Sequence, residues 1–375
     1  DDKDGIPSSA KLPGGSYAGL DLYAMGARAG RPTILLHIDW MQSVNDEGIK
    51  PRKEALFMLR EAFNRQGIDL LIDVGQLYSP VFNPADFNLG NGKEVAYARC
   101  VQLYKNNDCA NAMDYKNASM DVRRRLIAHY LLMGSTQNSN GYGGASGLAE
   151  INGNDLLVTL GLWGLSSSSA NDLYKLINFQ ASTIMHELGH NLGLQHGGHE
   201  ELNNKPNYLS VMNYDYQLYG VPNDATDASV NERIYYRQNT SFGRATPGKA
   251  ANTYNMCDLI DGPCSARFLL DYSNGRSLAL NEANLDEKLL LGRGVKNGAF
   301  ADWNYNGGVD STVARDVNDD GQQQSSMADY DDWSHIALAF SGGFSLRSLS
   351  YAPQNSKAKR RLIEAPQTLS VETAP

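Results

Sequence analysis

The feature that most constrains this sequence is a run of histidines within residues 181–199. His186 and His190 are four residues apart, so a helix places them one turn apart on a common face. Gly193 can end that helix, because glycine accepts the left-handed conformation that turns the chain back. His196 can then approach the same point from the loop that follows. Three imidazoles around one point predict a zinc site with an open position for water.

Glu187 adds a base to the predicted metal site. It lies next to the first histidine, where it can reach a water at the metal without being a ligand. The pattern H-E-x-x-H-x-x-G-x-x-H fixes five positions, and its chance occurrence in a chain of this length is on the order of one in 100,000. His199 lacks the spacing of a ligand, so we interpret it as a solvated loop residue. An apolar stripe on the same segment should face the core: Ala181, Ile184, Met185, Leu188 and Leu192.

The complete motif resembles the long zinc signature of the metzincin metallopeptidases. Residues 210–214, Ser-Val-Met-Asn-Tyr, are similar to the Met-turn of the serralysin and astacin groups of that superfamily. The resemblance implies that Met212 lies beneath the zinc as an apolar floor. It also implies that Tyr214 is a switchable ligand of the metal or a hydrogen-bond donor to the transition state. The alternatives are an ordinary core methionine and an ordinary tyrosine.

The resemblance implies a secreted zinc-dependent endopeptidase that hydrolyses peptide bonds of proteins, with Glu187 as the general base. The chain is most similar to bacterial secreted zinc metalloproteases whose catalytic unit adjoins aspartate-rich calcium repeats. Two other functions stay open. One is a zinc peptidase directed at glycoproteins or mucins, and the other is a non-catalytic, calcium-dependent adhesion module that has kept a zinc site. The intact Glu187 favours an enzyme, because a binding module needs no base.

The pattern of apolar residues predicts an α/β (α+β) fold. Residues 33–39 and 68–74 read as buried strands. They are joined by a helix that begins at Pro51 and ends at Gly67. Such a strand–helix–strand unit is normally parallel and right-handed. Two further strands are predicted at residues 126–132 and 156–160. The metzincin resemblance implies a twisted mixed sheet over the active-site helix.

Four stretches describe the expected organisation of the chain. Residues 1–29 form an N-terminal segment, and residues 30–215 form the catalytic subdomain through the Met-turn, with a polar insertion at 76–118. Residues 216–345 form a C-terminal subdomain. Residues 346–375 are expected to be a fraying tail.

The substrate is expected to lie extended along an exposed sheet edge, to which it adds a strand. The candidate edge is Gly147–Ile151, which follows a glycine-rich segment. The alternative reading of this segment is an ordinary strand. We expect the chain to act as a monomer.

The composition is that of an ordinary globular protein, with 42% hydrophobic and 20% charged residues among 375. The formal net charge of -9 argues against a nucleic-acid partner, because no broad positive field is available to hold phosphates. No window approaches the roughly 18 apolar residues of a membrane span.

The four cysteines form two close pairs, Cys100 with Cys109 and Cys257 with Cys264. Neither spacing is the short C-x-x-C of many zinc sites. Each pair can close a local disulfide loop, which would suit an oxidising, extracellular compartment. The alternative is four unrelated buried thiols.

Two aspartate-rich loops in the last third suggest calcium. Alternating oxygen side chains before a glycine suit a hard cation, although the twelfth positions, Val313 and Met327, are not the glutamate of an EF-hand. The candidate ligands are Asp302, Asn304, Asn306 and Asp310 in one loop and Asp316, Asn318 and Asp320 in the other. The loops could share Asp329, Asp331 or Asp332. The alternative is a pair of Asn/Asp/Gly turns.

Two further elements complete the expectations. The spaced acids of residues 1–7 are similar to part of a calcium-binding repeat, and a plain polar turn is the alternative. Residues 278–291 read as a helix that precedes the aspartate-rich loops.

Overall fold

The computed structural model describes residues 2–104, 108–223, 255–288, 303, 304, 306 and 309–339, and the backbone of 362–364. The chain forms two compact units that alternate along the sequence. The first comprises Asp1–Ser166, Thr183–Gly193 and Ile336–Thr368, and the second comprises Ser167–Ser182, Leu194–His335 and Leu369–Pro375. The domain limits at residues 29, 215 and 345 stay predictions.

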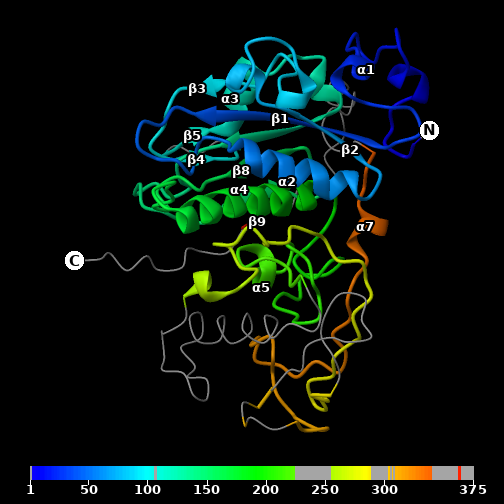
Figure 1. Ribbon diagram of the computed structural model, residues 1–375, viewed down its shortest axis with the longest axis vertical. Helices are drawn as coiled ribbons and strands as arrows, with labels where there is room; N and C mark the ends of the chain where they lie inside the picture. The colour runs from blue at the N-terminus through cyan, green and yellow to red at the C-terminus, as the bar shows by residue number, and fades with distance from the viewer. Residues whose placement is uncertain are drawn as a thin grey trace, which may run out of the picture. The chain divides into compact units, whose positions relative to one another are not determined.

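The first unit is built on a seven-stranded mixed sheet (Figure 1), with the order β2-β1-β6-β8-β7-β9 and with β3 also paired to β1. The strands are β1 (Thr33–Met41), β2 (Asp69–Asp73), β3 (Glu94–Val95), β6 (Ala128–Met133), β7 (Gly147–Glu150), β8 (Asp155–Val158) and β9 (Leu362–Glu364). The pairs β1–β2, β1–β3, β1–β6 and β6–β8 are parallel, and β7 is antiparallel to β8 and to β9. This architecture confirms the predicted fold class.

The first crossover has the predicted form. Helix α2 (Lys53–Asn64) joins β1 to β2, and Thr33 pairs with Asp69 in the parallel register. The predicted apolar face of α2 is buried: Ala55, Leu56, Leu59, Ala62 and Phe63. The chain turns at Gly67, whose φ of 75° is easily reached only by glycine.

Both faces of the central strand are covered. All nine residues of β1 are buried, as expected for a parallel strand between two layers. Figure 1 shows α2 and α3 (Ala112–Ser119) on opposite sides of β1. The layer on the α3 side is an apolar cluster that includes Leu35, Met41, Ala112 and Leu132.

The insertion at 76–118 contains more regular structure than the sequence indicated. It includes α3, the strands β4 (Val101–Gln102) and β5 (Ala110–Asn111), and the short 3-10 turns Gly75–Leu77 and Pro84–Asp86 at or near its start. The disulfide Cys100–Cys109 joins the residues that precede β4 and β5, with Cα atoms 5.1 Å apart. It confirms the first predicted pair.

Buried carboxylates at the ends of β1 and β2 hold this insertion. Asp73 accepts from the backbone N–H groups of Leu89 and Asn91 at 2.9 and 3.0 Å. Asp39 accepts from the N–H of Lys93 at 3.0 Å. Because parallel strands end at one edge, these two acids fasten the returning loop to the sheet.

The acidic side chains of the N-terminal turn bind the ammonium group of Lys11. The buried ammonium of Lys11, in the 3-10 turn Ser8–Lys11, donates to the carboxylates of Asp2 and Asp4 and to the carbonyl of Arg31. Asp4 also accepts from the N–H of Thr33 at 2.6 Å. The turn is thereby tied to the start of β1, and calcium at this turn stays a prediction.

The second unit has few regular elements among its described residues. These are the first part of α4 (Ala170–Asn191), α5 (Tyr214–Gln217), the 3-10 turn Met256–Asp258 and α7 (Asp332–His335). A small core holds it together: Leu280, Leu285, Trp303, Val313, Val317 and Met327. The second predicted disulfide, Cys257–Cys264, is formed here.

The helix predicted at 278–291 is wrong over its described part, residues 278–288. Leu280 instead pairs with Met327, and Leu285 pairs with Val313. A turn between them is closed by the hydrogen bond from the N–H of Asn284 to the carbonyl of Asn281, at 2.9 Å. The apolar spacing that suggested a helix places these leucines in the small core as bridge residues.

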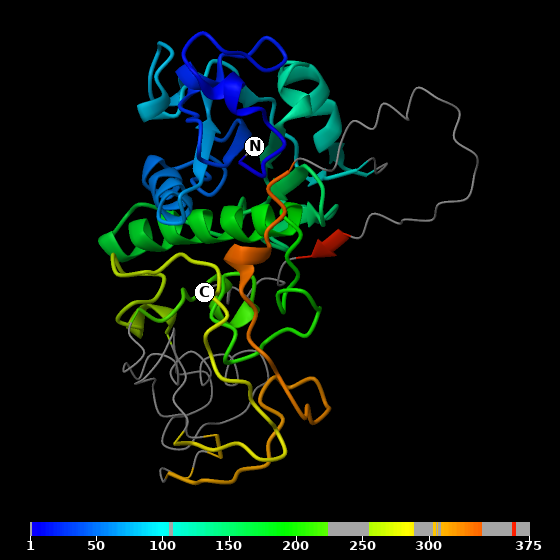
Figure 2. The same cartoon turned by 90° about the vertical axis from the view of Figure 1, so that its right-hand side faces the viewer.

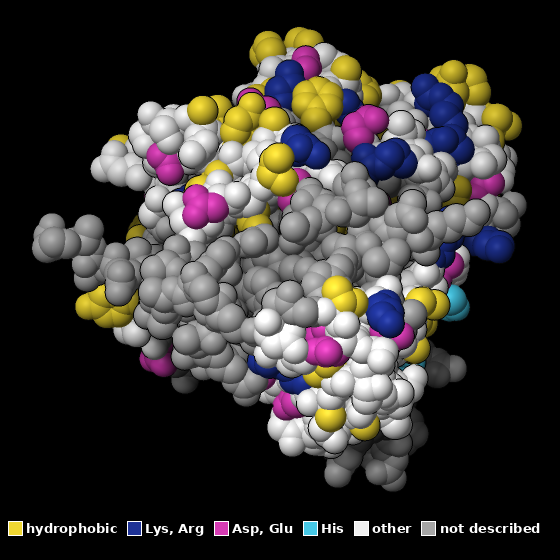
Figure 3. Space-filling view, turned by 60° about the horizontal axis from the view of Figure 1, so that its bottom comes forward, with side chains coloured by type: hydrophobic (Ala, Val, Ile, Leu, Met, Phe, Trp, Pro, Cys, Tyr) yellow, Lys and Arg dark blue, Asp and Glu magenta, His cyan; other side chains and the backbone are white. Residues whose placement is uncertain are grey.

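The described residues include no helix long and apolar enough to cross a membrane. On the face drawn in Figure 3, the described Lys and Arg side chains lie among acidic and apolar ones rather than in one positive field. Figure 2 shows β9 as the short strand at the red end of the colour scale. The segment that was predicted as a fraying tail therefore contributes a strand to the sheet.

Candidate metal centre and active site

Helix α4 positions the first two histidines. Ile184, Met185 and Leu188 are fully buried, so the predicted apolar stripe does face the core. His186 and His190 lie one turn apart and are also fully buried, with their Nε2 atoms 3.1 Å from each other. Two ring nitrogens held this close either share a proton or bind one cation between them.

Two features of the structure require glycine at position 193, just after the end of α4. Gly193 has a φ of 97°, and its N–H donates to the carbonyl of His190 at 2.9 Å. A Cβ at this position would come within 2.6 Å of Oδ1 of Asn152. The N–H of Asn152 in turn donates to the carbonyl of His190. The turn that leads away from α4 is thereby fixed by backbone contacts.

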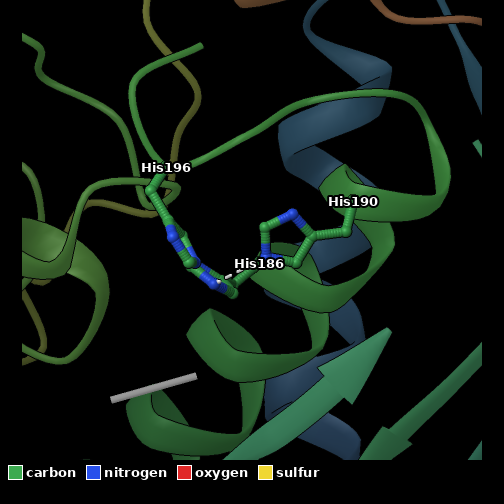
Figure 4. Close-up of side chains that lie close together, drawn as sticks. All are labelled: His186, His190 and His196. Carbon is green, nitrogen blue, oxygen red and sulfur yellow. Dashed lines mark hydrogen bonds between the residues drawn. The ribbon is translucent and has the colours of Figure 1, made fainter. Parts of the chain in front are cut away.

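The three histidines form one cluster. His186, His190 and His196 each offer a ring nitrogen, and these atoms all lie within 4.8 Å of one another. Figure 4 shows the rings of His186 and His190, which project from the helix, meeting that of His196 from the loop beyond it. Zinc–nitrogen bonds of 2.0–2.1 Å in a tetrahedron separate the nitrogens by about 3.3 Å. The donor set and its spacing therefore fit zinc.

A buried lysine fixes the loop that carries His196. Lys205 is fully buried, and its Nζ donates to the carbonyls of Gly197 and Ala328 and to Oε1 of Glu200, each at 2.8 Å. The first of these carbonyls immediately follows His196. Sequence reasoning missed Lys205, because a lysine among polar residues gives no sign that it will be buried.

Glu187 lies beneath strand β7 of the sheet. Its side chain is fully buried, and neither carboxylate oxygen has a hydrogen-bond partner among the described residues. Burial raises the pKa of this carboxyl well above its usual range. A Cβ at Gly147 would come within 2.3 Å of Oε1 of Glu187. The backbone of β7 therefore passes directly over the carboxylate.

The predicted Met-turn, residues 210–214, is held by its own polar side chains. Met212 is fully buried, and its N–H donates to Oγ of Ser210 at 3.2 Å. Asn213 donates through Nδ2 to the carbonyls of Lys205 and Tyr208. Tyr214 begins α5, and its ring centroid lies 4.4 Å from that of His196. The structure thus places Tyr214 beside the third histidine.

Asp332 anchors the Met-turn from the start of α7. It accepts from the Tyr208 hydroxyl at 2.8 Å, from Oγ of Ser210 at 2.7 Å and from the N–H of Ser273 at 3.0 Å. Burial raises the pKa of Asp332 to about 7. The sequence suggested this residue only as a shared calcium acid. Its contacts place it at the start of the predicted Met-turn, and a role in binding calcium stays a prediction.

The candidate calcium residues are held mainly by hydrogen bonds within their loops. Asp302 lies outside the described residues. Asn304 and Asn306 donate through Nδ2 to Oδ2 of Asp310, at 2.8 and 2.6 Å. In the other loop, the carboxylate of Asp316 accepts from the backbone N–H groups of Asp320 and Gly321, and Asn318 donates to Oδ2 of Asp320.

Buried glutamates organise both of these loops. Glu287 accepts from the N–H groups of Trp303 and Asp310, at 2.6 and 2.8 Å. Glu282 accepts from the N–H of Val317 at 2.7 Å. Among the described residues, only the three histidines form a group of His, Cys, Asp or Glu side chains close enough to hold a metal. Calcium at the aspartate-rich loops stays a prediction.

His199 lies apart from the histidine cluster. It is exposed, as expected for a solvated loop residue, and its ring centroid lies 4.8 Å from that of Tyr330. A Cβ at Gly198 would come within 2.5 Å of the Tyr330 side chain. Tyr330 therefore packs closely on the loop between His196 and His199.

Comparison with known proteins gives one match. Residues 71–197 match the family model of Reprolysin-like metallopeptidases, family M12B. No curated protein and no solved structure matches the chain. The matched region contains all three histidines and ends before the Met-turn. Together with the histidine cluster, the match supports a zinc metalloendopeptidase, whose residues 71–197 are a reprolysin-like segment of metzincin type.

Proposed function

We propose that the chain is a secreted endopeptidase that cleaves proteins with Glu187 as its general base and Tyr214 as a donor to the transition state. The observation that carries this proposal is the buried carboxylate of Glu187, next to the first histidine and below the backbone of Gly147. A carboxylate with no described hydrogen-bond partner is costly to bury. This cost is expected for a catalytic carboxylate that forms its hydrogen bond only when the substrate and its attacking water are bound.

The protein residues would divide the reaction between them. The three histidines would hold zinc, which supplies a Lewis acid that polarises a carbonyl and lowers the pKa of water. Glu187 would take a proton from the attacking water as the carbon–oxygen bond forms. It would pass that proton to the leaving nitrogen as the carbon–nitrogen bond breaks. Tyr214, beside His196, would donate a hydrogen bond from its hydroxyl to the developing oxyanion.

The substrate would bind as an additional strand on β7. The backbone of this strand passes over Glu187, so an extended peptide paired there would bring a scissile bond close to the carboxylate. All three candidate ligands come from one chain, which supports a monomeric enzyme.

Two further parts of the proposal concern the surroundings of the enzyme. Two disulfides, Cys100–Cys109 and Cys257–Cys264, support secretion, because such bonds persist in oxidising compartments. Calcium in the aspartate-rich loops is supported by their oxygen-rich side chains and glycine turns. It would brace the small core of the second unit rather than take part in the chemistry.

The test is hydrolysis of denatured casein by the full chain and its variants, with the metal content measured for each. Glu187→Ala should keep about one zinc per chain and lose at least about a hundredfold in turnover. His196→Ala should lose zinc and activity. His199→Ala, which removes an exposed histidine outside the cluster, should lose neither. Unchanged turnover in Glu187→Ala would exclude Glu187 as the base.

A further inference from the structure

The outer edge of β7 is the place where a peptide can approach Glu187. One side of this strand pairs with β8, through Gly147↔Val158, Leu148↔Leu157 and Ala149↔Leu156. The other side presents backbone N–H and C=O groups that accept a further strand of almost any sequence.

This edge is already paired with a segment of the same chain. Strand β9 lies antiparallel to β7, with Leu148↔Glu364, Ala149↔Ile363 and Glu150↔Leu362 as the paired positions. Both strands belong to the first unit, and Figure 2 shows β9 as the red strand.

We propose that β9 is an internal competitor, which occupies the edge of β7 where an extended substrate would bind. This inference rests on the proposed function, since it takes that edge as the substrate site. An extended peptide and β9 need the same backbone groups of Leu148–Glu150, so both cannot pair there together. Substrate must displace β9 before it can reach Glu187.

The competition is expected to be moderate. A tethered segment acts at an effective concentration of the order of millimolar, which favours its pairing over that of a free peptide. The ladder covers only three residue pairs, however, and a short isolated ladder is weak. We therefore expect release of β9 to improve peptide binding by roughly tenfold, rather than to switch on an inactive enzyme.

The tail variant is designed from the geometry of the ladder. Successive residues of a strand direct their N–H groups to opposite sides, so one of any two neighbours donates to β7. Leu362→Pro combined with Ile363→Pro removes that donor whichever residue supplies it. The matched control places two prolines just beyond β9, as Gln367→Pro with Thr368→Pro. Ile363→Pro with Glu364→Pro serves as a second, independent tail variant.

Two measurements on the full chain test the inference without relying on turnover. The first is hydrogen exchange at the amides of Leu148–Glu150. The second is fluorescence anisotropy with a labelled peptide of the tail sequence Arg360–Pro366, measured in the Glu187→Ala background so that the probe stays intact. Both tail variants should exchange faster and bind the peptide about tenfold more tightly, whereas the control should match the parent protein.

The outcomes separate this inference from the proposed function. Equal peptide affinity and equal exchange in tail variants, control and parent would overturn the role of β9, even if casein is cleaved. Tighter binding in the tail variants, with no casein cleavage by any protein with Glu187 intact, would support the role of β9 and refute the proposed catalysis. If both hold, the KM of the tail variants for an extended peptide should fall by a similar factor while kcat stays unchanged.

Discussion

The stability of the predicted Met-turn depends on the protonation state of Asp332. Its folded pKa of about 7 lies above the ordinary value of 3.8, so the folded state binds a proton more tightly than the unfolded state. The contribution of Asp332 to stability is therefore complete below about pH 4 and is lost as the pH rises through about 7. The loss is at most about 4 kcal/mol, at 1.36 kcal/mol per pH unit.

Asp332→Asn should remove this pH dependence, because the amide does not titrate. Urea unfolding of the parent and variant at pH 5 and pH 8 measures it. The variant should lie close to the parent at pH 5 and should lose less stability than the parent toward pH 8. Asp331→Asn, one residue earlier and only partly buried, is the control and should follow the parent. Parallel pH profiles of Asp332→Asn and the parent would contradict the prediction.

A second prediction at the residue scale concerns the hydroxyl group of Tyr214. Tyr214→Phe keeps the ring beside His196 but removes the hydroxyl, so turnover should fall by at least about tenfold while zinc content stays the same. Peptide hydrolysis and metal analysis measure these two effects. Tyr330→Phe, beside the exposed His199, should leave turnover within about twofold. A normal rate for Tyr214→Phe would remove this hydroxyl from the mechanism.

Single residues were predictable where the chemistry is local. The histidine spacing and Gly193 follow from the periodicity of one helix and the turn that ends it. Lys205 and Asp332 were not predictable in the same way. Lys205 donates to the carbonyl of Ala328, and Asp332 accepts from Tyr208, across more than a hundred residues. Such contacts leave no pattern in the sequence.

Strand β7 brings the backbone of the sheet close to the proposed base, Glu187. Gly147→Ala would place a methyl group 2.3 Å from Oε1 of Glu187, so the buried carboxylate must move. We expect turnover to fall by at least about tenfold with zinc retained, because small displacements of a catalytic group are costly. Kinetics and metal content on the purified variant give the answer.

A matched control tests whether crowding alone explains that loss. Gly92→Ala would bring a methyl group within 2.4 Å of the carbonyl oxygen of Asp73, in β2 at the opposite end of the sheet order from β7 and β9. It should cost stability in the same way but leave turnover closer to that of the parent. Similar loss of turnover in both variants at equal stability would show that Glu187 is not specifically affected.

Helices and strands were predictable where the spacing of apolar residues and the length of the segment indicated the same element. The strand–helix–strand unit of β1, α2 and β2 follows from apolar runs and from helical spacing bounded by Pro51 and Gly67. Helix α4 begins at Ala170, before the apolar stripe that starts at Ala181, and its first part belongs to the second unit. There Asn178 donates to the carbonyls of Pro263 and Ser265.

Long-range pairing limits prediction for the whole molecule. Strand β9 is separated from β7 by most of the chain, and nothing in its local sequence requires that partner. The two compact units also alternate along the sequence, so no shift in composition marks their limits. The fold class was predictable from the first hundred residues and the zinc motif, whereas the pairing of the C-terminal segment was not.

The second unit gives the last prediction, because its small core should need support. Six buried side chains, which include Trp303 and Met327, form that cluster. The two aspartate-rich loops contribute Trp303 and Val317 to it and donate backbone hydrogen bonds to Glu287 and Glu282. An ion bound at 100 times its dissociation constant adds about 2.7 kcal/mol. At roughly 2–4 °C per kcal/mol, removal of calcium should lower the melting temperature by about 5 °C or more.

Thermal unfolding with and without a calcium-selective chelator measures this shift, and zinc analysis confirms that the histidine site is unchanged. Asp316→Asn with Asp320→Asn removes two of the candidate charges, so this variant should melt at the same temperature with or without the chelator. Added calcium should restore the parent but not the variant. A parent that is insensitive to the chelator would mean that Glu282 and Glu287 hold these loops through backbone hydrogen bonds alone, without an ion.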